Sequence, residues 1–298
     1  MRRGVLAAPA TGAYIAGMHT FRIVNVFTID GDRFSGNPLC VFDDARGIGD
    51  AQMQALALQM NLSETTFVLP TDKAGADARV RIFTPGFELP FAGHPTLGTA
   101  SVVGGDKPRV VLDLGVGLVP VTRAGNTWTL RTARAPETRP ASGTRAEIAR
   151  MLGLPEDAVC DEPLWVSTGV EQLVIPIASA ALVRAANPVP DLLDRWGTSP
   201  ARAQGAMAYL WASDEPTWTV RFFFIANGAV REDPATGSAC ANLGGWHIAR
   251  GRAPMSATLR QGDAVGRPSR LDLRVDADGG IFVTGGVIEL ARGSVDLG

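Results

Sequence analysis

Short runs of apolar and β-branched residues, separated by polar and glycine-containing loops, recur along the whole chain. Runs of this length and composition are typical of β-strands. We expect strands at Phe21–Phe27, Leu39–Phe42, Thr65–Leu69, Val80–Phe83, Arg109–Asp113, Gly117–Thr122, Thr127–Arg131, Trp165–Thr168, Gln172–Ile177, Ala206–Trp211, Trp218–Ala226, Ser256–Arg260, Arg270–Val275 and Gly280–Leu290. With only a few helical segments between them, these strands predict an α+β protein.

Helices are predicted where apolar residues recur every three or four positions. One runs to Met60 with Asp50 as its N-cap, and another runs from Thr144, which forms a capping box with Glu147, to Leu152. Shorter helical stretches are expected near Ala178–Arg184 and Asp191–Trp196. The segment Ala133–Gly143, rich in Pro, Arg and Ser, is the best candidate for a linker.

Two segments share the form Pro-x-x-Gly-polar and stand 144 positions apart, at Pro90–His94 and Pro234–Ser238. Each follows a strand-like run, which for the second segment is Val220–Ala226, and each opens a helical segment rich in small residues. The first N–H groups of such helices have no partner within the helix and can bind an anion. The repeated context predicts a two-lobed, pseudo-symmetric molecule.

Composition excludes several classes of function. The chain of 298 residues has a net charge of −2 and no basic stripe, so nucleic acid is not an expected partner. No apolar run approaches the length that spans a membrane. The three histidines and three widely separated cysteines show no metal-ligand spacing. We expect free, buried cysteines and a reducing, cytoplasmic location.

The first 18 residues differ from the rest of the chain. Arg2 and Arg3 precede a mildly apolar run, but Pro9 and Gly12 interrupt the apolar core that a secretion signal needs. We therefore expect residues 1–18 to form a disordered extension, or to follow from a start codon assigned too early.

Four blocks of residues identify a family. They are Phe27-Thr28 through Gly36-Asn37-Pro38, Asn61–Thr65, Phe83-Thr84-Pro85 through Gly93–Gly98, and Glu232–Ala239, followed later by Gly266–Ser269. With these blocks the chain, from Phe21 onwards, resembles the PhzF-like phenazine-biosynthesis family, whose members are isomerases that use no cofactor. The resemblance implies the diaminopimelate epimerase-like fold, α+β with two pseudo-symmetric lobes, each a curved mixed β-sheet around a central helix. It also implies an active site between the lobes, and a homodimer.

The resemblance divides the chain into two lobes. Residues 19–136 would form the first, carrying Glu64 and His94 and completed by the C-terminal strand at about 284–298. Residues 137–283 would form the second, carrying Asp233 and Ser238.

The same match assigns Glu64, Asp233 and His94 as catalytic, with Glu64 the principal acid/base, and Gly93, Gly237 and Ser238 as substrate-binding. A carboxylate in a dry cleft has a pKa nearer neutrality, which suits it to take up a proton and return it. The substrate implied is a small carboxylate such as trans-2,3-dihydro-3-hydroxyanthranilate, bound with no cofactor or metal.

Other interpretations of these residues remain open. Glu64 could be a solvated edge carboxylate, His94 a helix cap and Asp233 a turn residue before proline. The same cleft could serve a hydrolase, a lyase or a protein that only binds small anions. A serine hydrolase is disfavoured because no Gly-x-Ser-x-Gly elbow is present. Two-thiol racemisation is disfavoured because Ala92 and Thr236 stand where epimerases of this fold carry cysteine.

Overall fold

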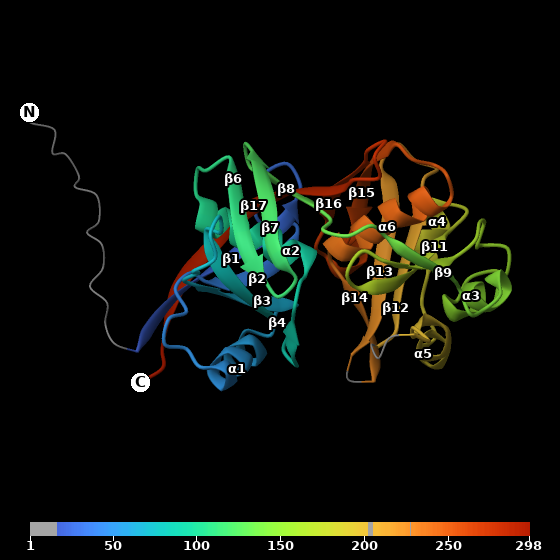
Figure 1. Cartoon of the computed structure of the whole chain (residues 1–298). Coiled ribbons are helices and arrows are strands. Elements are labelled where there is room, and N and C mark those ends of the chain that lie inside the picture. Colours follow the sequence, from blue (N-terminus) through green and yellow to red (C-terminus); the bar gives the residue numbers. More distant parts are fainter. Residues whose placement is uncertain (1–16, 202–204, 227) are drawn as a thin grey trace, which may run out of the picture.

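The computed structural model describes residues 17–201, 205–226 and 228–298, so the extension predicted for residues 1–18 falls, apart from its last two residues, outside the described residues. Two lobes lie side by side, and each is a curved sheet around a central helix (Figure 1). The central helix is α2 (Gly93–Gly104) in the first lobe and α6 (Gly237–Ala249) in the second. The predicted α+β, two-lobed architecture is confirmed. In the described ranges we find no helix long and apolar enough to cross a bilayer.

The remaining elements lie around these two helices. The strands are β1 (Met18–Thr28), β2 (Asn37–Phe42), β3 (Glu64–Leu69), β4 (Ala78–Phe83), β5 (Glu88–Leu89), β6 (Arg109–Leu114), β7 (Gly117–Ala124), β8 (Thr127–Arg131), β9 (Glu137–Pro140), β10 (Leu164–Ser167), β11 (Glu171–Pro176), β12 (Met207–Ala212), β13 (Trp218–Ala226), β14 (Ala229–Asp233), β15 (Met255–Gln261), β16 (Ser269–Val275) and β17 (Ile281–Asp296). The outer helices are α1 (Asp50–Met60), α3 (Arg145–Met151), α4 (Ala180–Ala185) and α5 (Pro190–Gly197), with a 3₁₀ turn at Asp263–Val265.

The two sheets pair their strands in the same pattern. In the first lobe β2 lies parallel to β3, and β3 lies antiparallel to β4. On its other edge β4 pairs with β5, antiparallel, and with β6, parallel. In the second lobe β11, β12, β13, β14 and β15 repeat these pairings in the same directions. This correspondence supports the pseudo-symmetry that the two Pro-x-x-Gly segments predict.

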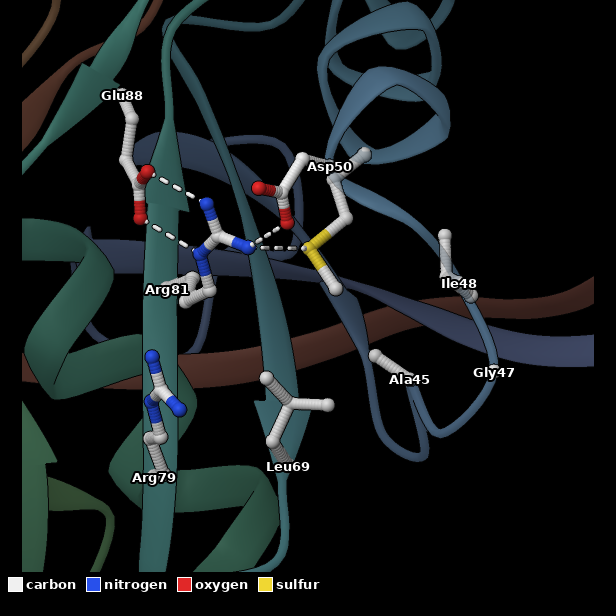
Figure 2. Close-up of a pocket in the computed structure, with 9 residues that line it drawn as sticks. Ala45, Gly47, Ile48, Asp50, Leu69, Arg79, Arg81 and Glu88 are labelled. Atoms are coloured by element: carbon white, nitrogen blue, oxygen red, sulfur yellow. Dashed lines mark hydrogen bonds and ion pairs between the residues drawn. The ribbon is translucent and has the colours of Figure 1, made fainter.

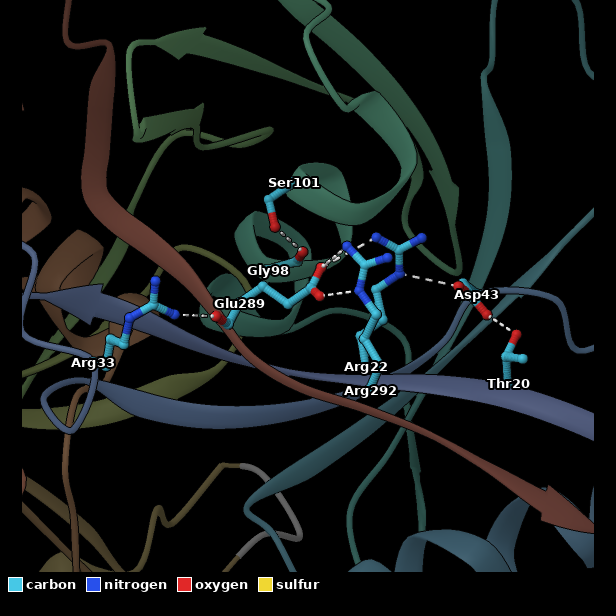
Figure 3. Close-up of polar contacts among 8 residues, drawn as sticks. All are labelled: Thr20, Arg22, Arg33, Asp43, Gly98, Ser101, Glu289 and Arg292. Carbon is cyan, nitrogen blue, oxygen red and sulfur yellow. Dashed lines mark hydrogen bonds and ion pairs between the residues drawn. The ribbon is translucent and has the colours of Figure 1, made fainter. Parts of the chain in front are cut away.

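Strand β17 connects the lobes. Its first residues pair with β16 and β8, and its later residues pair with β1 from Gly286 to Asp296. Arg22 on β1 strengthens this seam, because its guanidinium donates to Glu289 on β17 at 3.1 Å and to Asp43 beyond β2 at 3.0 Å (Figure 3). The C-terminal strand thus lies in the first lobe's sheet, whereas the exact bounds of the two lobes stay a prediction.

Several local predictions need correction. Val220–Ala226 does not lead directly into the second helix, because β14 folds back on β13 as a hairpin before α6 begins. Gly49, not Asp50, is the N-cap of α1, and its N–H donates to Gln52 Oε1 at 3.0 Å. The predicted linker contains β9, which pairs with β10. Cys160 is exposed, whereas Cys40 and Cys240 are buried as expected.

Both central helices are buried because small residues let the sheet approach their backbones. A Cβ atom placed on Gly98 of α2 would lie 2.6 Å from Leu39 Cδ2 and 2.9 Å from Val26 Cγ2. Gly244 of α6 has similar neighbours, since its Cβ would lie 2.9 Å from Ile281 Cγ2. Bulkier residues at these positions would push the helix away from the sheet.

We predict that Gly98→Ala destabilises the protein by about 1–3 kcal/mol, because the added methyl group overpacks the core. A loss of stability would be informative, because replacing glycine by alanine inside a helix by itself stabilises the helix by roughly 1 kcal/mol. Urea unfolding would measure it, with Gly86→Ala in the exposed β4–β5 loop as the control, where the nearest atom is 4.0 Å from the new Cβ. A Gly98→Ala protein as stable as the parent would contradict this account of the helix.

Candidate active site

The N-termini of α2 and α6 meet where the lobes join. A Cβ atom on Gly93 would lie 3.2 Å from the carbonyl carbon of Gly237 and 3.3 Å from the amide nitrogen of Ser238. A Cβ atom on Gly237 would lie 3.4 Å from the amide nitrogen of His94. Within the described residues, no acceptor pairs with the N–H of His94 or Ser238. Two positive helix ends therefore meet at one point, which favours a bound anion.

Asp233, at the end of β14, is held by residues of both lobes. Asn37 and Ser63 of the first lobe donate to Oδ1 at 3.0 and 3.3 Å. Thr236 of the second lobe donates to Oδ2 at 2.6 Å. The second lobe's carboxylate is thus fixed against the first lobe, close enough to Glu64 for its charge to raise the pKa of that residue.

Glu64 and His94 face each other within the first lobe. Glu64 begins β3, His94 is the second residue of α2, and His94 Nδ1 lies 3.4 Å from Glu64 Oε2. The Glu64 side chain is 16% exposed overall, but Oε2 itself is buried and has no hydrogen-bond partner. Nε2 of His94 is likewise buried, and no described residue pairs with it. Both atoms therefore keep an unused capacity for hydrogen bonding inside the protein.

The three titratable side chains of the site have different pKa values, each shifted from its ordinary value by burial. Burial, reinforced by the charge of Asp233, raises the pKa of Glu64 from 4.5 to about 8. Burial raises the pKa of Asp233 to about 6, against the opposing effect of the hydrogen bonds from Thr236, Asn37 and Ser63. Burial lowers the pKa of His94 to about 3, so its contact with Glu64 joins two neutral groups at pH 7 and is not an ion pair.

The structure thus brings together all six residues that the sequence singles out, from three segments of chain. No role was predicted for Asn37 or Ser63, although both stand in blocks that carry the family resemblance. Gln172, whose Nε2 donates to Ser238 Oγ at 2.9 Å, was not predicted either. A buried strand carrying Asn or Gln at an inward position is the signal that could have found Asn37 and Gln172.

Open hollows lie elsewhere on the first lobe. One of about 460 Å³ lies between α1 and β4, where Arg81 is held by Asp50 and Glu88 (Figure 2). None of its lining residues belongs to the predicted site. In the described part of the chain no three His, Cys, Asp or Glu side chains cluster as a metal site would require.

Known proteins resemble most of the chain. The family model described as phenazine biosynthesis-like protein matches residues 24–286. An uncharacterised isomerase of Pasteurella multocida is 38% identical over 93% of this chain and 94% of its own length. The trans-2,3-dihydro-3-hydroxyanthranilate isomerase of Pseudomonas aeruginosa is 35% identical, over 88% and 92%. A solved structure of a Bacillus anthracis phenazine biosynthesis protein of the PhzF family has a TM-score of 0.78 at 22% identity, covering 93% and 99%, and shows the same fold.

We predict a pH-dependent stability difference between the parent and Glu64→Gln. Above about pH 4.5 the unfolded chain ionises Glu64, whereas the folded protein keeps the proton up to about pH 8. The parent therefore loses stability relative to the neutral variant as pH rises from 4.5 to 8, by an amount on the order of a few kcal/mol. Thermal unfolding between pH 4 and 9 would measure it, with the exposed Glu156→Gln as the matched amide control. A difference that does not change with pH would show that Glu64 is not buried as described.

Proposed function

This chain belongs to the phenazine biosynthesis-like family, and we propose that it is an isomerase that moves a proton between two carbons of a small carboxylate-bearing substrate without a cofactor. One observation carries the proposal: the buried Glu64 carboxyl group, with its pKa near 8, stands beside two helix N-termini where the N–H groups of His94 and Ser238 meet no acceptor among the described residues. Proton transfer needs a group that works in both directions, and the charge that develops needs fixed donors.

Glu64 is the proposed acid/base. Roughly a tenth of the molecules carry it ionised at pH 7, because the pKa lies about one unit higher. The carboxylate takes a proton from a substrate carbon, and the electron pair moves into the conjugated system of the substrate. The resulting acid then returns a proton at a second carbon, so that the product has the same composition as the substrate.

The helix N-termini bind the negative charge. The N–H groups of His94 and Ser238 would donate to the substrate carboxylate or to the enolate-like oxygen that forms during transfer. His94 is neutral, so its ring can donate or accept one hydrogen bond without adding a charge. Asp233 is mostly ionised at pH 7 and raises the pKa of Glu64, which keeps the acid form available.

The proposed substrate is small and carries a carboxylate, and a ring that bears an amino group is the first structure to consider for it. The relative from Pseudomonas aeruginosa is named for trans-2,3-dihydro-3-hydroxyanthranilate, which makes that compound the first to test. A two-thiol mechanism is not supported, because the residues that precede the two glycines, Ala92 and Thr236, have no thiol. Formation of a product that had gained or lost water would instead favour a hydrolase or a lyase.

We predict that Glu64→Gln lowers kcat by about 10²–10⁴-fold, because general acid/base catalysis contributes about that factor. Affinity for a carboxylate ligand should stay within a few-fold, since the shape of the site is kept and the helix amides remain. Turnover and ligand titration, with Glu156→Gln as the control, would measure both. A loss in kcat of only a few-fold would place the base elsewhere.

We also predict that kcat/KM rises with pH and levels off above about pH 8, as Glu64 becomes ionised in the free enzyme.

Asp233→Asn should be slower but still active. Its profile of kcat/KM against pH should shift to lower pH, because the charge that raises the pKa of Glu64 is gone. Initial rates between pH 5 and 10 would test this. An unshifted profile in Asp233→Asn would contradict the coupling of the two carboxyl groups.

A further inference from the structure

A buried chain of hydrogen bonds runs behind Ser238 in the second lobe. Gln172 of β11 donates from Nε2 to Ser238 Oγ at 2.9 Å. Asn242, one turn along α6, donates from Nδ2 to Gln172 Oε1 at 2.7 Å and to the Val170 carbonyl at 2.9 Å. Thr168, in the turn between β10 and β11, donates to Asn242 Oδ1 from both its N–H and its hydroxyl, each at 2.8 Å. Gln172 and Asn242 are almost fully buried.

The direction of every bond in this chain follows from one backbone group. The N–H of Thr168 can only donate, so the atom of Asn242 that faces it must be the oxygen. The amide nitrogen of Asn242 must then face Gln172, which must present its own oxygen. The nitrogen of Gln172 therefore faces Ser238, whose oxygen accepts that bond. The usual ambiguity in the orientation of amide side chains is removed here.

Ser238 is left with a hydroxyl proton that no described residue accepts. Its own amide lies beside Gly93 at the junction of the two helix ends. The turn that contains Thr168, where the series of hydrogen bonds begins, also lies at the boundary between the lobes. A Cβ atom on Gly169 in this turn would lie 3.8 Å from Phe91 Cδ1 in the first lobe. The ordered chain thus ends at the candidate site.

Among the described residues of the first lobe, the hydroxyls of Thr66 on β3 and Thr99 on α2 share a buried bond of 2.8 Å, but no longer series of hydrogen bonds leads to the helix start. The offset of 144 positions that relates Gly93 to Gly237 places His94 opposite Ser238 and Gly98 opposite Asn242. Gly98 packs against the apolar side chain of Leu39, whereas Asn242 bonds Gln172. Burying two amide side chains at a position where the first lobe has an apolar contact costs desolvation, and this cost indicates a role beyond holding the helix.

We propose that Gln172 and Asn242, anchored by Thr168, are positioning residues that fix the Ser238 hydroxyl as a hydrogen-bond donor to an acceptor-only group, the substrate carboxylate. This inference rests on the proposed function for the identity of the bound group. Because the hydroxyl is held to one direction, the site selects a carboxylate over a carboxamide, whose NH₂ group would meet another donor. A charge-assisted bond of this kind is worth about 10- to 100-fold in affinity.

The test compares 2-aminobenzoate with 2-aminobenzamide as ligands of the full-length protein, by calorimetric titration. The parent should prefer the carboxylate. The aspartate in Asn242→Asp can still accept from Thr168 but can no longer donate to Gln172. The side-chain amide of Gln172 should then rotate, so that its nitrogen faces the aspartate and its oxygen accepts the Ser238 hydroxyl proton. This variant should lose about 10- to 100-fold in carboxylate affinity and little in carboxamide affinity. Gln172→Met adds no charge and should lose part of the preference for the carboxylate. It can replace Asn242→Asp in this test if that variant does not fold.

A double-variant cycle separates positioning from simple charge repulsion. If Asn242 acts through Ser238, then Asn242→Asp should have little further effect in a Ser238→Ala background. Gln54→Glu, on α1 and away from the site, is the control and should keep the preference. Additive losses, or an equal affinity of the parent for both ligands, would overturn the proposal. A parent that showed the expected preferences but no isomerase turnover would instead count against the proposed function alone.

Discussion

The close approach of the α2 and α6 N-termini is the constraint on which the rest of the structure depends. Glycine fits both positions closely: a Cβ atom on Gly93 would crowd the backbone of the opposite helix at 3.2–3.3 Å, and a Cβ atom on Gly237 would crowd the ring of Phe27. Phe27 lies against this junction in a left-handed conformation, with a φ of 65° and no exposed surface, and its ring lies 3.1 Å from where a Cβ on Gly237 would be. Two positive helix ends held this close need a negative partner, which the fixed Asp233 carboxylate partly supplies and an anionic ligand would complete.

Burial then sets the chemistry that the junction can carry out. The same exclusion of water raises the pKa values of both carboxyl groups and lowers that of His94, so the three groups hold different protonation states at one pH. Asp233 receives three side-chain hydrogen bonds that favour its ionised form, whereas Glu64 Oε2 receives none. Two similar carboxyl groups are thereby assigned different roles by their neighbours, a division that acid/base enzymes commonly use.

The sequence predicted the elements that depend on local pattern and missed the contacts that depend on tertiary packing. The Pro-x-x-Gly segments located both helix starts, and the capping box at Thr144 was found because its signals lie within four residues. The short strands β5 and β14 were not predicted, since segments of two and five residues without a clear apolar pattern acquire strand geometry only by pairing with β4 and β13. The bond from Asn37 to Asp233 joins residues 196 positions apart, and no local pattern records it. The hydrogen-bond chain from Thr168 to Ser238 was invisible for the same reason.

Transfer of hydrogen from substrate labelled at carbon is the measurement that tests the central claim most directly. With trans-2,3-dihydro-3-hydroxyanthranilate deuterated at the carbon that loses its proton, the protein alone, with nothing added, should give an isomer of unchanged composition. The account predicts a primary isotope effect on kcat/KM, and deuterium that is either moved to the second carbon or exchanged with water through the Glu64 carboxyl group. Consumption of the substrate without an isotope effect, or product that had gained or lost water, would contradict proton transfer by Glu64.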